Sequence, residues 1–154
     1  MFRISRLTDY GTLILVFLAD QQGRLCSATE VAAGTHVAPP TVRKLLKVLA
    51  KTGFVDSVRG TDGGYRLARN PGLITAAEIL DALEGPVAIT ECSTDDSDCV
   101  LEHLCQVGSA WQKINGALRV ALSEITLEDL GRQQGEIAPL ALKRKPGELR
   151  TPTN

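Results

Sequence analysis

Apolar residues at helical spacing indicate two helices in the first 35 residues. The strongly apolar stretch 8–20 predicts a first helix, with Thr8 as its N-cap and Asp9 in the first turn, where a negative charge suits the helix dipole. Ser27 and Glu30 have the spacing of a capping box, in which each side chain bonds the backbone amide of the other residue. They predict a short second helix that ends near Thr35.

A third helix opens at Pro39 or Pro40, because a proline lacks only an amide that the first helical turn leaves unpaired. Its apolar residues recur at i, i+3, i+4 and i+7 and should face the core: Val42, Leu45, Leu46 and Leu49. The polar residues lie elsewhere on its circumference: Thr41, Arg43, Lys44, Lys47 and Lys51. This pattern is typical of a helix that is anchored on one face and exposed on the other.

Two short strands follow the third helix. Residues 54–58 and 65–68 have strand character, and the turn-rich stretch 60–64 between them contains Asp-Gly, a hairpin signal. Thr75 then caps a fourth helix that ends at Gly85. Three helices followed by a two-stranded hairpin form a winged helix-turn-helix. The sequence therefore predicts a mainly α protein of this class, with a small two-stranded wing.

The second half predicts an acidic loop, one long helix and a tail. Apolar residues mark one face of a helix from about Leu104 to Ile125: Trp111, Ile114, Leu118, Ala121, Leu122 and Ile125. A small domain has little core to cover so long a stripe, so we expect it to form a homodimer with a second copy. The expected divisions are a winged-helix domain at 1–86, a cysteine-bearing loop at 87–108, a dimerisation helix region at 109–130 and a disordered tail at 131–154.

Charge is unevenly distributed, although the net charge is only −1. Residues 39–69 contain seven Lys and Arg and two acids, whereas residues 70–112 contain eight acids and no Lys or Arg. A basic half beside an acidic half favours a protein that binds double-stranded DNA. The alternative is a structural helix-turn-helix in an unrelated protein, whose basic face is only solvated. The candidate DNA-binding residues lie in the third helix and at the start of the wing: Pro40, Thr41, Arg43, Lys44, Lys47 and Arg59.

The chain has four cysteines, and three of them, Cys92, Cys99 and Cys105, fall within fourteen residues. Clustered thiols in a reducing compartment more often bind metal or do redox chemistry than form structural disulfides. Soft thiolates select iron–sulfur clusters, zinc or cuprous copper, and the spacing here is not the Cys-x-x-Cys pair of a zinc ribbon. We expect the fourth, Cys26, to be a small buried residue.

Four stretches of the sequence carry a family signature: Leu7-Thr8-Asp9-Tyr10, Val58-Arg59-Gly60, residues 63–69, and Ile74-Thr75 with the helix that ends Leu83-Glu84-Gly85. They resemble the IscR/NsrR-type (Rrf-type) winged-helix iron–sulfur transcription regulators, over about residues 1 to 130. Within that family the sequence looks most like the regulators of the SUF iron–sulfur assembly system. The resemblance implies a cytoplasmic, homodimeric repressor of iron–sulfur assembly genes.

The resemblance also implies that the three clustered cysteines hold an iron–sulfur cluster, of the 2Fe–2S or the 4Fe–4S type. Three ligands leave one coordination position open. In part of the family a histidine three residues after the third cysteine fills it, but Gly108 stands there in this chain. In nitric-oxide-sensing members an aspartate in the Thr-Asp motif of the first helix fills it from the other subunit. That motif points to Asp9, and His103 is the less favoured alternative.

Two other functions remain open: a nitric-oxide or redox-sensing repressor of the same fold, and a DNA-binding protein with a structural zinc on the same cysteines. An enzyme is disfavoured because no cysteine is paired with an evident base, and the sequence has no glycine-rich phosphate cradle. We also expect no membrane association, because the longest apolar run, from Leu13 to Ala19, is too short to span a bilayer.

Overall fold

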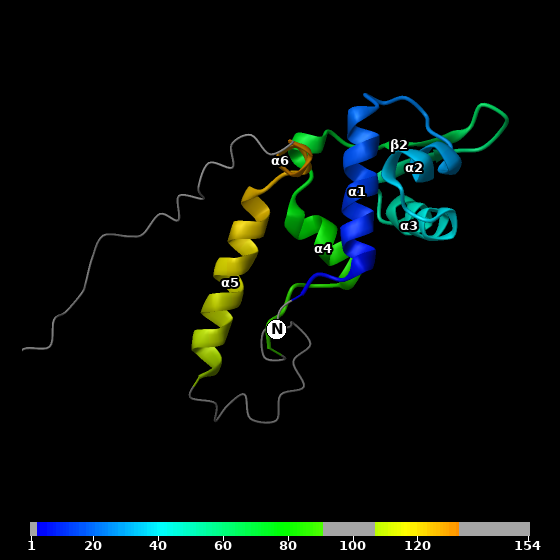
Figure 1. Ribbon diagram of the computed structural model, residues 1–154. Coiled ribbons are helices and arrows are strands. Elements are labelled where there is room, and N and C mark those ends of the chain that lie inside the picture. The colour runs from blue at the N-terminus through cyan, green and yellow to red at the C-terminus, as the bar shows by residue number, and fades with distance from the viewer. Residues whose placement is uncertain (1–2, 91–106, 133–154) are drawn as a thin grey trace, which may run out of the picture.

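The computed structural model describes residues 3–90 and 107–132 of the 154-residue chain. Figure 1 shows a group of short helices with a projecting hairpin, and one long helix that lies along the side of α4 remote from α1. The elements in chain order are α1 (Arg6–Asp20), α2 (Ala28–Thr35), α3 (Pro39–Lys51), β1 (Val55–Val58), β2 (Gly64–Leu67), the 3-10 helix η1 (Pro71–Leu73), α4 (Ala76–Glu84), α5 (Gly108–Glu124) and α6 (Leu127–Gly131). This order confirms the predicted winged helix.

The hydrophobic core lies between α1 and the helix-turn-helix formed by α2 and α3. On α1, Ile14, Leu15 and Leu18 are almost completely buried. The four apolar residues predicted to anchor α3 are at most 3% exposed: Val42, Leu45, Leu46 and Leu49. Burying one such side chain contributes about 1.5–3 kcal/mol, so this face fixes α3 firmly and leaves its other face to solvent.

The predicted capping box at Ser27 and the predicted N-cap at Thr75 are both present, and Thr75 also forms a capping box. At the start of α2, the Ser27 hydroxyl accepts from the Glu30 amide at 3.2 Å, and the Glu30 carboxylate accepts from the Ser27 amide at 2.7 Å. Thr75 and Glu78 form the same reciprocal pair at the start of α4. Arg24 donates to Glu30 at 2.9 Å and, together with the Ser27 bonds, lowers the pKa of that carboxyl to about 2.

The predicted N-cap of the first helix is wrong. α1 begins two residues earlier than expected, and its N-cap is Ser5, whose hydroxyl accepts from the Thr8 amide at 3.2 Å. Thr8 is the third residue of the helix and only 2% exposed, and its hydroxyl donates to Glu84 at 2.6 Å. Serine and threonine are both good N-caps, so the residue type does not show whether Ser5 or Thr8 begins the helix. The hydrogen bond from Thr8 to α4 decides in favour of Ser5. Asp9 stays in the first turn, as predicted.

The wing is an antiparallel pair of strands in which Val58 lies opposite Gly64. Cys26 adds one more rung, since its amide donates to the Tyr65 carbonyl and the Tyr65 amide donates to the Cys26 carbonyl, both at 2.8 Å. Gly64 permits this approach, because a Cβ there would lie 2.7 Å from the Cys26 carbonyl oxygen. The base of the wing is therefore fixed to the segment that leads into α2.

We expect Gly64→Ala to lower the free energy of unfolding by about 1–3 kcal/mol, because the added methyl group forces β2 away from Cys26. Gly116→Ala is the matched control: an added Cβ meets nothing within 4 Å there, and the site is inside α5. It should stabilise by about 0.5–1 kcal/mol. Urea unfolding at one protein concentration measures both, and a Gly64→Ala variant as stable as wild type would contradict the close contact.

The segments around α4 and α6 connect the long helix to the domain. The Ala76 amide donates to the Ile125 carbonyl, and the Leu127 amide donates to the Ile74 carbonyl, both at 2.8 Å. Leu127 itself is 1% exposed. The C-terminal end of α5 is therefore tied to the start of α4 on one side and to the core on the other.

The long helix begins later than predicted. α5 starts at Gly108 with Val107 as its N-cap, whereas the sequence predicts a start at about Leu104. Leu104 fits the helical spacing of the apolar stripe, so periodicity alone could not place the boundary. In the part of the chain that the structure describes, no helix combines the length and apolar character needed to cross a bilayer.

Candidate nucleic-acid interface and thiolate site

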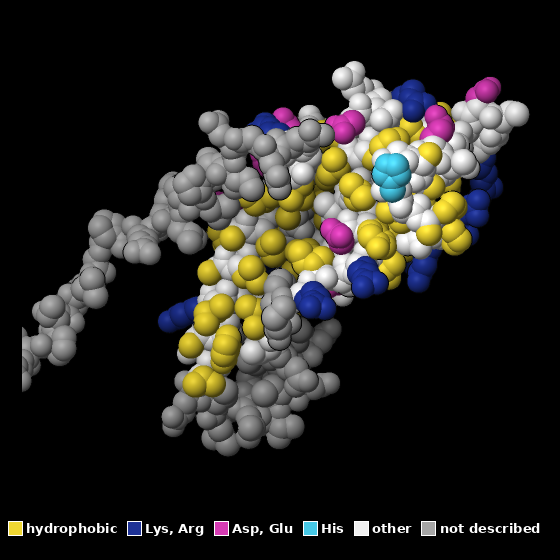
Figure 2. Space-filling model, viewed as in Figure 1, with side chains coloured by type: hydrophobic (Ala, Val, Ile, Leu, Met, Phe, Trp, Pro, Cys, Tyr) yellow, Lys and Arg dark blue, Asp and Glu magenta, His cyan; other side chains and the backbone are white. Residues whose placement is uncertain are grey.

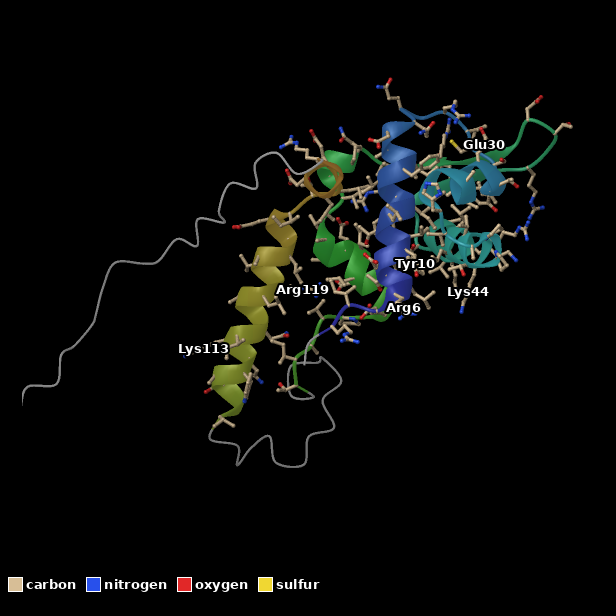
Figure 3. The ribbon with its side chains drawn as sticks, in the orientation of Figure 1. Arg6, Tyr10, Glu30, Lys44, Lys113 and Arg119 are labelled. Atoms are coloured by element: carbon tan, nitrogen blue, oxygen red, sulfur yellow. The ribbon has the colours of Figure 1, made fainter. Side chains whose placement is uncertain are left out.

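The structure places all six predicted DNA-binding positions at the surface. Pro39 is the first residue of α3, so the helix opens as the sequence predicts. Thr41 is half-buried, and the other five residues are exposed: Pro40, Arg43, Lys44, Lys47 and Arg59. Arg59 directly follows β1 in the turn of the wing, and Lys44 points away from the core (Figure 3).

The Lys and Arg residues of the described ranges differ in whether a carboxylate pairs with them. Five arginines form ion pairs with carboxylates at 2.6–3.2 Å: Arg24, Arg66, Arg69, Arg119 and Arg132. Among residues 3–90 and 107–132, no carboxylate pairs with the cations of α3 and the wing turn: Arg43, Lys44, Lys47, Lys51 and Arg59.

The unpaired cations give one edge of the molecule its positive charge. Figure 2 shows Lys and Arg side chains in a line along the edge that carries α3 and the wing. A carboxylate partner would cancel the field of each cation, so unpaired cations keep the potential that attracts phosphates. This edge has the charge, and α3 has the exposed helical face, that insertion into a DNA major groove requires.

The predicted thiolate site lies outside the described residues, because Cys92, Cys99, Cys105 and His103 all fall in the range 91–106. Asp9 is described: it is exposed on the first turn of α1, and no Lys or Arg of the described ranges pairs with it. Within those ranges no group of three or more His, Cys, Asp or Glu could hold a metal ion.

Cys26 is the small buried residue that the sequence predicts. It is 0% exposed, and burial raises the pKa of its thiol. It packs within the hydrophobic core, where cysteines are inert. Cys26 is therefore a core residue, apart in the sequence from the three cysteines of the predicted thiolate site.

A hydrogen-bond network that the sequence does not predict joins the end of α4 to the start of α1. One oxygen of Glu84 accepts from the Thr8 hydroxyl at 2.6 Å and from the Ser5 amide at 2.7 Å, and these bonds lower the pKa of the Glu84 carboxyl. Beside them, a Cβ on Gly11 would lie only 2.6 Å from a methyl carbon of Leu83. No local pattern signals this network, because Glu84 is 76 residues from Thr8 and 79 from Ser5.

We expect this network to make stability depend on pH through Glu84. Its bonds favour the charged carboxylate, so the stabilisation is fully present above the usual Glu pKa of about 4.3. It is lost as the pH falls through the lowered pKa of the folded state. Between roughly pH 5 and 3, wild type should therefore lose more unfolding free energy than Glu84→Gln, as measured by urea unfolding. Equal losses would show that Glu84 does not stabilise the start of α1.

One side of α5 is held by its own chain through polar contacts. Gly108 and Asn115 are the buried residues of this helix. The Asn115 side-chain oxygen accepts from the Ile89 amide at 3.2 Å. Arg119 donates through both terminal nitrogens to Asp81 on α4, at 2.6 and 3.1 Å. These contacts place α5 against α4 and fix which of its faces points away.

The N-terminal part of the apolar stripe of α5 is turned away from the chain's own core, whereas the rest of the stripe is half-buried. Trp111 is 41% exposed and Ile114 is 48% exposed, while Asn115 is buried. The apolar surface continues beyond α5, because Figure 2 shows hydrophobic side chains on the face between α5 and α1, and Leu13 of α1 is 43% exposed. A continuous exposed apolar surface of this kind marks an interaction site.

A basic recognition helix, a two-stranded wing whose turn carries an arginine unpaired among the described residues and a buried helix-turn-helix core define a winged-helix DNA-binding transcription regulator. A family model described as Rrf2, an iron-dependent transcriptional regulator, matches residues 4–133. The chain therefore belongs to the Rrf2 family, which confirms the resemblance that the sequence carries.

Similar proteins include several regulators. The HTH-type transcriptional regulator NsrR of Bacillus licheniformis is 28% identical over 140 residues, which are 90% of this chain and 98% of NsrR. The structure of CymR, the global cysteine regulator of B. subtilis, matches with a TM-score of 0.65 and 32% identity, over 85% of this chain and 97% of CymR. The structure of T. potens IscR matches with a TM-score of 0.63 and 30% identity, over 84% of this chain and 85% of that chain. The relatives are regulators and not enzymes, and the same holds for this protein.

Proposed function

We propose that this Rrf2-family regulator is a cytoplasmic homodimer that represses iron–sulfur assembly genes of the SUF type under the control of an iron–sulfur cluster. The observation that carries the proposal is the sequence position of three thiols, which fall within fourteen residues between the winged helix and α5. The description of the family as iron-dependent supports it.

On the DNA side, α3 enters the major groove. Residues near its N-terminus contact base edges: Pro40, Thr41, Arg43 and Lys44. Lys47, further along the helix, contacts phosphate and contributes affinity without specificity. Arg59 in the wing turn reaches the adjacent minor groove, where a narrow groove concentrates negative potential. The absence of carboxylate partners around these cations in the described ranges supports this assignment.

On the dimer side, the apolar stripe of α5 packs against the second copy. The stripe residues Trp111, Ile114, Leu118 and Ala121 follow one another at alternating steps of three and four, which is the spacing of a helix that packs along another helix. Trp111 and Ile114 are exposed in the single chain, whereas Leu118 and Ala121 are half-buried. The two exposed residues support this, because burying them requires a partner. The partner copy also sets the distance between the two recognition helices, which must match half-sites about one DNA turn apart.

The donor set fits an iron–sulfur cluster, since soft thiolates are the usual ligands of such clusters. Cys92, Cys99 and Cys105 would hold it, with Asp9 of the partner subunit as the fourth ligand and His103 as the alternative. When bound, the cluster supplies an oxidisable link between the cysteine segment, residues 87–108, and α1. Asp9 suits this role because it is exposed and next to Thr8, which is hydrogen-bonded to the end of α4.

This arrangement connects the thiolate site to DNA binding through α1 and α4. Glu84, which comes shortly before the cysteine segment in the chain, is hydrogen-bonded to the first turn of α1. Ile89, near the start of that segment, is hydrogen-bonded to Asn115 of α5. A change in the cysteine segment therefore acts on elements that pack on the helix-turn-helix and on the dimer helix. The spacing of the two recognition helices then changes, and with it the affinity for DNA.

The test is iron and acid-labile sulfide analysis, with visible absorption spectra, of protein purified without oxygen. Wild type should be coloured and contain iron and sulfide. Cys92→Ala, Cys99→Ala and Cys105→Ala should each lose most of both, because each removes a ligand. Cys26→Ala is the matched control and should keep the cluster, since Cys26 is buried in the core. Colourless, iron-free wild type would contradict the proposal.

The same analysis, followed by DNA-binding measurements with nitric oxide or cysteine added, distinguishes the competing functions. Zinc without sulfide would indicate a structural metal on the same cysteines. A cluster that reacts with nitric oxide and releases DNA would indicate a nitric-oxide sensor of the same fold. Metal-free protein whose DNA binding responds to cysteine would indicate a function like that of CymR, which is similar over most of this chain.

A further inference from the structure

We infer that the DNA-binding surface extends from α3 and the wing onto the first turn of α1, where Arg6 binds a backbone phosphate of the duplex. The inference rests on the proposed DNA binding and adds a contact outside the helix-turn-helix and the wing. It comes from the position, the free charge and the fixed backbone of Arg6.

Arg6 lies on the same side of the molecule as the recognition helix. It is the first residue of α1 and is exposed. Figure 3 shows Arg6 at the end of α1 next to α3, with Lys44 of α3 beyond it and Tyr10 one turn further along α1. In Figure 2 the Lys and Arg side chains continue along the lower edge of the molecule from α3 toward the start of α1. A duplex that lies along α3 therefore passes near Arg6.

The Arg6 guanidinium is not paired with a carboxylate in the described ranges. Two acids lie nearby in the sequence or the fold, and neither pairs with it. Asp9 is on the same turn, and the Glu84 oxygen Oε1 accepts from the Ser5 amide and the Thr8 hydroxyl. Arg6 therefore resembles the unpaired cations of α3 and differs from Arg24, Arg69 and Arg119, which are ion-paired.

The backbone that carries Arg6 is held in place. The Ser5 amide, directly before Arg6, donates to Glu84 at 2.7 Å. One turn later, Gly11 packs closely against Leu83, whose methyl carbon would lie 2.6 Å from an added Cβ. Because the first turn of α1 is fixed to α4, binding a phosphate through Arg6 orders only its side chain and not a flexible terminus. The cost of binding is therefore small.

An arginine–phosphate contact of this kind does not read sequence, because every nucleotide presents the same phosphate. Arg6 should therefore raise affinity for any duplex to a similar degree. It should also add to the salt dependence of binding, because each neutralised phosphate releases counterions. These two properties separate Arg6 from the base-contacting residues of α3.

The test is the affinity of the full chain for a mixed-sequence DNA duplex as a function of salt concentration, for wild type, Arg6→Gln, Arg6→Lys and Lys113→Gln. Lys113 is a matched control: it is exposed and has no ion pair in the described ranges, and it lies on α5, away from α3 (Figure 3). Removing either charge changes the net charge equally, so any difference between the two variants reports a local contact.

For Arg6→Gln we expect affinity to fall about fivefold near physiological salt for each protomer that engages the DNA, and the slope of log affinity against log salt to become shallower by about 0.9 per protomer. Arg6→Lys should keep the wild-type slope, and Lys113→Gln should behave like wild type. An Arg6→Gln slope equal to that of Lys113→Gln would overturn this inference and leave the proposed function intact. Wild type that binds no duplex would overturn both.

Discussion

Reversing the charge of the recognition helix, with Lys44→Glu and Lys47→Glu together, should reduce affinity for promoter DNA on the order of 10³-fold in a dimer near physiological salt. Both lysines are exposed on α3 and unpaired among the described residues. In the proposed dimer the two changes remove two phosphate-facing charges at Lys47 and two base-facing charges at Lys44. The loss of the two phosphate contacts should lower the salt slope by about 2. Fluorescence anisotropy at several salt concentrations measures both quantities.

The control for this variant carries the same charge change elsewhere. Lys113→Glu with Arg132→Glu also reverses two charges per chain, on α5 and directly after α6. The ion pairs of Arg132 are exposed and contribute little to stability, so the fold should tolerate the change. A similar loss of affinity in both variants would mean that total charge and not the α3 face governs DNA binding.

Ile114→Asp should convert the proposed dimer into monomers. Ile114 is 48% exposed in the single chain, so a monomer tolerates the aspartate, whereas an interface would bury an unpaired carboxylate. Burial of that kind costs several kcal/mol for each copy, which corresponds to a loss of dimer affinity of at least about 10³-fold. Sedimentation at a series of protein concentrations measures the dissociation constant, and DNA affinity should fall in parallel.

Val120→Asp is the matched control for the dimer prediction. Val120 is 59% exposed on the same helix, and helical spacing places it well away from the line through Trp111, Ile114 and Leu118. It should therefore stay dimeric. If both aspartate variants dissociate, or if neither does, the apolar stripe is not the interface.

The sequence predicts the winged helix well because the signals that define it are local. The capping boxes at Ser27 and Thr75, the proline at the start of α3 and the Asp-Gly turn each specify one element within a few residues. The exposed and buried faces of α3 follow from the same kind of short-range periodicity. For that reason the candidate DNA-binding positions could be named from sequence, and the structure places them at the surface.

What sequence reasoning missed depends on residues that are far apart in the chain. Thr8 and Ser5 are both acceptable caps, and only the contact of Thr8 with Glu84 decides which one begins α1. The burial of Asn115 and its bond to Ile89 could not be predicted either, because the apolar periodicity of α5 does not show which side meets α4. The ligand positions Cys92, Cys99, Cys105 and His103 remain predictions, as they lie outside the described residues.

The measurement that most directly tests the central claim compares cluster-loaded protein with cluster-free protein from the same preparation, titrated without oxygen onto the promoter of SUF-type assembly genes. We expect the loaded dimer to bind this DNA more tightly by about 5- to 150-fold, the usual range of coupling between two sites. The same affinity in both forms, with cluster content verified by iron and sulfide analysis, would contradict the account: the protein would still bind DNA, but the thiolate site would not control it.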